Sequence, residues 1–88
     1  MSTQEEQYIQ RIAEAGFLEE YQGIMSVTKE GAALETQHPE QAAQKFLEAL
    51  KMVEATGAIP GANNHPLFGT RTTLLNFLGD LSRRGIAW

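Results

Sequence analysis

The chain of 88 residues has no cysteine, three prolines and one tryptophan, and its uninterrupted apolar stretches are only a few residues long. Without cysteine the chain has no disulfides, no thiolate metal ligands and no cysteine nucleophile. The apolar stretches are too short for a membrane-spanning helix, which needs about 20 apolar residues. The first residues are polar and acidic, unlike the basic start of a signal peptide. These features predict a cytoplasmic protein.

Length and composition indicate a single domain over residues 1–88. The chain is 42% hydrophobic and 20% charged, which is typical of a globular protein and argues against general disorder. A chain of this size buries only about 60–65% of the surface that its unfolded form exposes. We therefore expect its apolar helix faces to be needed for a thin core.

The net charge of −4 is unevenly distributed. Residues 1–44 carry eight glutamates against two basic residues, whereas residues 45–88 carry five basic residues against three acidic ones. Such asymmetry can mark an interaction surface. Glutamate is also a good helix former and is usually exposed, so solvated helix faces are the simpler interpretation.

Helix start and stop signals are clear at the beginning of the chain. Ser2 with Glu5, and Thr3 with Glu6, have the spacing of a capping box. Apolar residues then recur at helical spacing until Gly16, which predicts a helix end. Residues 17–36 keep a helical stripe, but Gly23 and Ser26 within it favour two short helices or one kinked helix.

The strongest helix is predicted over residues 39–56, because Pro39 suits the first helical position and a wide apolar face follows. The last helix is predicted from Thr70 to Arg84, with Gly69 and Thr70 at its cap and Gly85 as its stop. No segment shows the alternation of a strand. The predicted fold is an all-α, compact bundle of about four helices.

No residue pattern predicts catalysis or a cofactor. His38 and His65 both precede prolines and lack the i, i+4 spacing of a helical zinc site, so helix-cap positions explain them better. Ser26 and Ser82 lack the sequence around a hydrolase nucleophile. We therefore predict no enzyme activity, no metal and no cofactor.

Nucleic-acid binding is the alternative function that the last helix suggests. Arg71, Asn76, Arg83 and Arg84 could reach a phosphate backbone from it. However, this helix follows the 13-residue connection Gly57–Gly69, whereas a helix-turn-helix has a turn of about three or four residues. The negative net charge also opposes binding to phosphate.

The leading hypothesis is a non-enzymatic protein–protein interaction module, such as a small adaptor, inhibitor or accessory subunit. The connection holds apolar residues among glycines, prolines and asparagines, as a binding loop does, and tryptophan is frequent at interface hot spots. The predicted contact residues are Ile59, Asn63, Asn64, Leu67, Phe68 and Trp88. The competing interpretation is that these apolar groups complete the core. The predicted partner is another protein rather than a nucleic acid or a membrane, and the acidic first half of the chain would suit a basic surface on it. A homodimer is a further possibility that the sequence leaves open.

Overall fold

Four α-helices follow one another in the computed structural model, which describes residues 3–88. They are α1 (Gln4–Glu14), α2 (Leu18–Leu34), α3 (Pro39–Ala55) and α4 (Phe68–Arg83). Across these described residues there is no strand, which confirms the predicted all-α fold. None of the four helices is long and apolar enough to cross a membrane.

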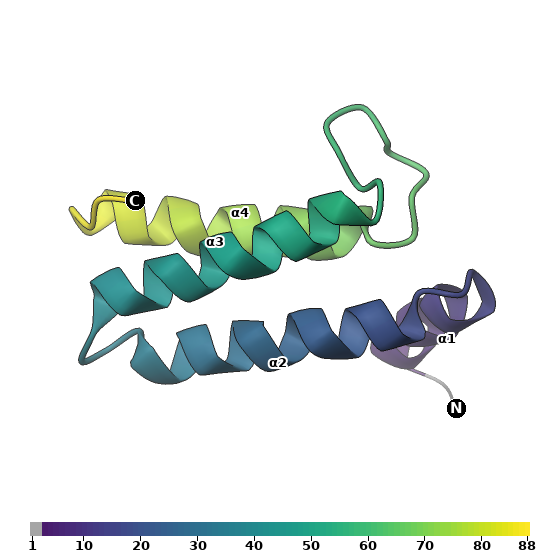
Figure 1. Ribbon diagram of the computed structural model, residues 1–88, viewed down its shortest axis with the longest axis horizontal. Coiled ribbons are helices and arrows are strands. Elements are labelled where there is room, and N and C mark those ends of the chain that lie inside the picture. Colours follow the sequence, from purple (N-terminus) through teal and green to yellow (C-terminus); the bar gives the residue numbers. More distant parts are fainter. Residues whose placement is uncertain (1–2) are drawn as a thin grey trace.

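Helix α3 lies in the middle of the molecule. It packs on α2 along one side and on α4 along the other, and these two contacts are the most extensive between helices. The chain direction alternates from α2 to α3 to α4, and the short α1 lies where α2 begins (Figure 1). The connection between α3 and α4 projects at this same end, whereas the C-terminus lies at the opposite end (Figure 1).

Helix α1 begins and ends where the sequence predicts. Thr3 is its N-cap, and the capping box with Glu6 is complete: the Glu6 amide donates to Thr3 Oγ1 at 3.1 Å. Ser2, the other predicted cap residue, lies outside the described residues. Gly16 has a φ of 86°, the left-handed conformation that glycine adopts without strain, and the Phe17 amide donates back to the Ile12 carbonyl.

Helix α2 is continuous from Leu18 to Leu34, so the prediction of two short helices in residues 17–36 is wrong. Ser26 is exposed and begins no new helix. Gly23 and Gly31 lie within the helix, where Gly31 is buried against Phe46 of α3. Packing along α3 therefore outweighs the helix propensity that the two glycines lose.

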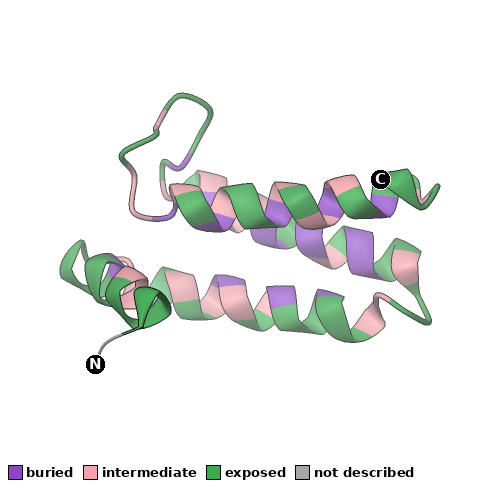
Figure 2. Ribbon diagram, turned by 180° about the vertical axis from the view of Figure 1, so that it is seen from behind, coloured by how far each residue is buried: buried purple, intermediate pink, exposed green. Residues whose placement is uncertain are grey.

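Helix α3 supplies the middle of the core. It begins at Pro39, as predicted, and its buried face is Ala42, Ala43, Phe46, Ala49 and Val53. These residues meet the buried leucines of α4, Leu74, Leu78 and Leu81. Buried residues line the sides of the helices that face one another, and the outward sides are exposed (Figure 2).

Helix α4 starts at Phe68, two residues before the predicted start, and Leu67 holds the N-cap position. The prediction that Gly69 and Thr70 form the cap is therefore wrong. The Thr70 amide in the first turn donates instead to the hydroxyl of Tyr8, 62 residues away, at 3.0 Å. A tertiary contact with α1 satisfies this amide, so no local side-chain cap is needed.

Candidate interaction site

His65 makes hydrogen bonds that link the two ends of the connection between α3 and α4. His65 Nδ1 accepts a hydrogen bond from the Leu67 amide at 3.0 Å, and His65 Nε2 lies 3.0 Å from the Thr56 carbonyl. Because Nδ1 accepts, Nε2 carries the ring proton and donates to Thr56. The imidazole also packs on the Phe17 ring, with 4.9 Å between centroids. His65 therefore joins the end of α3, the start of α4 and the start of α2.

The predicted contact residues of this connection fall into two groups. Ile59 is 51% exposed, and Asn63 and Asn64 are also exposed, so these side chains are accessible to a partner. Phe68 is partly buried at the start of α4. Leu67 is 0% exposed and belongs to the core, which removes its side chain from any contact surface. Leu67 and the buried Ala58 anchor the two ends of the loop that carries Ile59.

Trp88 has both a structural contact and an exposed surface. Its indole Nε1 donates to the Leu78 carbonyl at 2.8 Å, so the tail folds back along α4. The residue is nevertheless 47% exposed. Trp88 lies at the opposite end of the molecule from α1 and the connection (Figure 1). The predicted contact residues therefore do not form one continuous surface.

The arginines predicted for nucleic-acid binding form ion pairs within the chain. Arg71 Nε lies 3.3 Å from Glu54 Oε2, and the Arg71 side chain is only 14% exposed. Arg84 Nη1 lies 3.4 Å from Glu35 Oε1, and Arg83 pairs with Asp80. Asn76 is exposed on α4. The positive charge of the last helix is thus largely balanced by neighbouring carboxylates.

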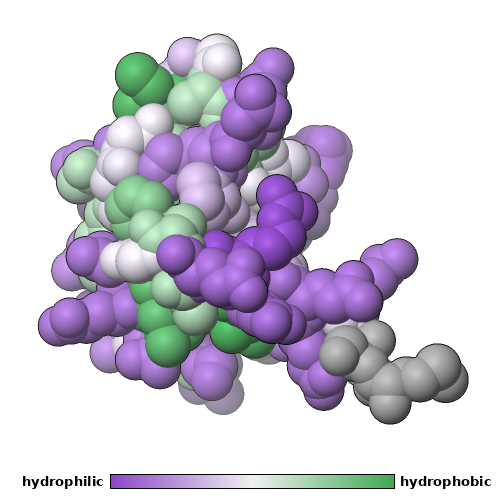
Figure 3. Space-filling view, turned by 90° about the vertical axis from the view of Figure 1, so that its right-hand side faces the viewer, coloured by the Kyte–Doolittle hydropathy of each residue, from purple (hydrophilic) through white to green (hydrophobic). Residues whose placement is uncertain are grey.

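Carboxylates without a cation partner gather in the first half of the described chain. Glu30 is paired with Lys45 at 2.9 Å, and this contact raises the pKa of the Lys45 ammonium. Within residues 3–88, no ion pair involves the acidic residues of α1 or of the first turn of α2. These residues are Glu5, Glu6, Glu14, Glu19 and Glu20. Figure 3, which faces the end with α1 and the connection, shows patches of apolar surface among hydrophilic side chains.

An apolar groove opens between the first half of α2 and the last turns of α3. Its volume is about 500 Å³, and its lining is Phe17, Glu20, Ile24, Met52, Ala55 and Thr56. Sequence reasoning missed this groove, because its walls come from two helices about 30 residues apart.

A second hollow, of about 390 Å³, lies between α1, α2 and α4. Tyr8, Tyr21 and Met25 contribute its apolar walls, and Thr70 and Thr73 of α4 face them. Burial, together with the nearby Tyr8 and Glu5, raises the pKa of the Tyr21 phenol. The Tyr8 hydroxyl at this hollow is hydrogen-bonded to Thr70 and so helps to attach α1 to α4. This hydroxyl is therefore already used by a contact within the chain.

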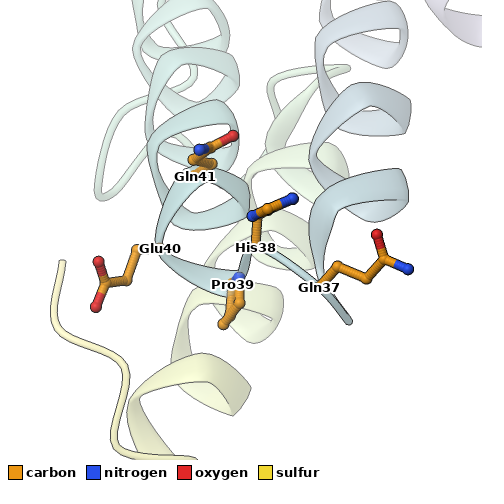
Figure 4. A pocket seen from close by; sticks show the side chains of 5 residues that line it. All are labelled: Gln37, His38, Pro39, Glu40 and Gln41. Carbon is orange, nitrogen blue, oxygen red and sulfur yellow. The ribbon is translucent and has the colours of Figure 1, made fainter.

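The turn between α2 and α3 forms a small polar depression of about 270 Å³ (Figure 4). Gln37, His38 and Glu40 contribute side chains that point in different directions around Pro39 (Figure 4). His38 is the N-cap residue of α3 but makes no side-chain capping bond. Across residues 3–88, no group of three histidine, aspartate or glutamate side chains is close enough to hold a metal ion. We find no converging set of polar groups in this depression.

We compared the chain with known proteins. No protein-family model matches the chain, and no curated protein or solved structure shows significant similarity to it.

Proposed function

We propose that this protein is a non-enzymatic protein–protein interaction module. The observation that carries the proposal is the position of Ile59. This residue exposes half of its apolar surface on a loop whose ends are fixed by buried Ala58 and Leu67 and by the hydrogen bonds of His65. A rigid loop that holds an apolar side chain outward loses little conformational entropy when a partner covers it.

The distribution of charge supports a protein partner over a nucleic acid. Arg71, Arg83 and Arg84 each lie against a carboxylate of the same chain. Binding to phosphate would have to break these ion pairs and overcome a net charge of −4. The exposed carboxylates of α1 and α2 instead suit a partner with basic residues.

Affinity capture from a lysate of the source organism, with and without nuclease, tests the proposal. We expect a stoichiometric protein partner that survives nuclease treatment. Ile59→Ser should weaken its capture by about fivefold or more, because apolar anchors dominate binding energy. Gln44→Ser, on the exposed side of α3, is the matched control and should capture normally. Recovery that depends on nucleic acid would overturn the proposal. The cytoplasmic setting and the homodimer stay predictions from the sequence.

A further inference from the structure

The groove between α2 and α3 is open in the structure. Ile24 forms its fully buried floor, while Ala55 is exposed at its edge. Phe17 packs against the His65 ring, and Met52 lies against Gly23, where a Cβ would come 3.4 Å from Met52 Cε. Contacts within the chain therefore support the two walls that a ligand would meet.

Negative charge predominates around this apolar groove. Glu20 lines it, and Glu14 and Glu19 lie close to Phe17 in the chain. The last turn of α3 contains no basic residue, so no charged side chain of that turn offsets its negative dipole end. The exposed Lys51 of α3 is the basic residue next to Met52 in the chain, and it does not balance the three glutamates. An occupant therefore gains from positive charge beside its apolar contact.

This charge argues against a second copy of the chain as the occupant. A symmetric contact over the groove would bring the carboxylates of both copies together, and like charges that face one another destabilise an interface. The same charge favours a partner with lysines or arginines beside an apolar side chain.

The dimensions of the groove fit a helix. Its α2 wall runs from Phe17 to Ile24, which is about 10 Å, or two helical turns, at about 1.5 Å per residue. A helix that packs into such a groove presents apolar residues at i, i+3 or i+4, and i+7 over this length. The groove between two packed helices is also where the ridges of a third helix fit.

We propose that this groove binds an amphipathic helix of another protein, with an apolar face flanked by lysines or arginines. The inference rests on the proposed function as a protein-interaction module and names the surface and the chemistry of the partner. Glu19 and Glu20 contact the basic flank, and the apolar anchor enters between Ile24, Met52 and Ala55.

Titration of the isotope-labelled protein by nuclear magnetic resonance tests the inference with two synthetic probes. One is a helical peptide of leucine and lysine in an amphipathic pattern, and the other has glutamate in place of each lysine. We expect the leucine–lysine peptide to shift the amides of the groove residues and the leucine–glutamate peptide to leave them unchanged. Shifts spread over the whole surface, or equal binding of both peptides, would overturn the inference.

Matched variants separate the groove from general charge attraction. Ala55→Phe fills the groove from an exposed position and should weaken binding of the leucine–lysine peptide at least about tenfold. Ala33→Phe adds the same ring to an exposed position near the end of α2 and should leave binding unchanged. Glu19→Gln with Glu20→Gln should weaken binding about two- to tenfold, whereas Glu40→Gln should have no effect. Equal effects of Ala55→Phe and Ala33→Phe on peptide binding would contradict the proposal that the groove is the binding site.

The same variants distinguish failure of the inference from failure of the proposed function. If Ala55→Phe still captures the nuclease-resistant lysate partner at full strength, the groove is not its binding site, but the module still binds protein. If the wild-type chain captures no protein partner, the proposed function itself fails. Concentration-dependent self-association with shifts at the groove would show a second copy as the occupant and would also overturn the inference.

Discussion

The contact between α2 and α3 and the contact between α1 and α4 stabilise this molecule in different ways. The contact of α2 with α3 centres on an apolar ring: Phe46 of α3 is 1% exposed and lies against Gly31 of α2. The same ring packs on Phe77 of α4, with 5.2 Å between ring centroids. The contact of α1 with α4 depends on a hydroxyl, since Tyr8 accepts from the Thr70 amide and lies 2.8 Å from Thr70 Oγ1. We therefore expect the stability of the first contact to depend on the volume and shape of the Phe46 ring. The second contact should depend on the position of the Tyr8 hydroxyl oxygen.

Removing the ring of Phe46 is expected to have the largest effect on the apolar contact. Phe46→Ala should lower the free energy of unfolding by about 3–5 kcal/mol, because it leaves a cavity under Gly31 and beside Phe77. Denaturant unfolding followed by circular dichroism measures this loss. Phe46→Leu keeps most of the volume and should cost clearly less. Similar losses for both variants would show that volume is not what the contact requires.

The two glycines of α2 should respond to alanine with opposite signs. A Cβ on Gly31 would lie 2.8 Å from Phe46 Cε1, and the buried ring cannot move away freely. Gly31→Ala should therefore destabilise the fold by about 1–3 kcal/mol despite its better helix propensity. A Cβ on Gly23 meets only Met52 Cε, at an ordinary 3.4 Å. Gly23→Ala should stabilise by up to about 1 kcal/mol in the same unfolding measurement, and stabilisation by both variants would contradict the close approach at Gly31.

Removing one oxygen tests the polar contact of α1. Tyr8→Phe should destabilise by about 1–2 kcal/mol, because the Thr70 amide loses its acceptor while the ring keeps its packing. Hydrogen exchange of the Thr70 amide should become faster. Tyr21→Phe is the matched control, since the hydroxyl of Tyr21 makes no comparable bond to α4 within the described residues. Unchanged exchange at Thr70 would show that the hydroxyl does not cap α4.

The smallest expected effect is a dependence of stability on alkaline pH. The pKa of Tyr21 is raised from its ordinary value of 10.0, chiefly by burial and also by Tyr8 and Glu5. The folded state therefore holds the phenolic proton more tightly than the unfolded state does. This contribution to stability is fully present below pH 10.0 and is lost as the pH rises through the higher folded pKa. Unfolding measured across this range should show a steeper loss in the wild-type chain than in Tyr21→Phe.

Much of the fold could be predicted because the relevant signals are local. The capping box of Thr3 and Glu6 and the start of α3 at Pro39 depend on residues within one helical turn. The break expected near Gly23 was wrong because α3 stabilises α2 from outside its own sequence. The start of α4 was misplaced for the same reason, since Tyr8 caps it from 62 residues away.

The candidate site was less predictable than the fold. Composition indicated that Ile59 and Trp88 were potential contacts, and both keep about half of their surface exposed. The same composition also selected Leu67, which the fold buries completely. From the sequence, an exposed apolar residue in a connection cannot be told from a buried one, because its burial depends on how close the fold brings it to the core.

The sequence by itself determined that this protein has an all-α fold, because apolar periodicity, helix caps and glycine stops act over a few residues. Only the tertiary structure decided which arginines form ion pairs, with Glu54, Asp80 and Glu35 as their partners. It also decided which carboxylates have no such partner within the described residues. It alone created the groove between Phe17 and Met52. Charge pairs and grooves depend on how separate helices meet, and that geometry is set by packing over the whole core.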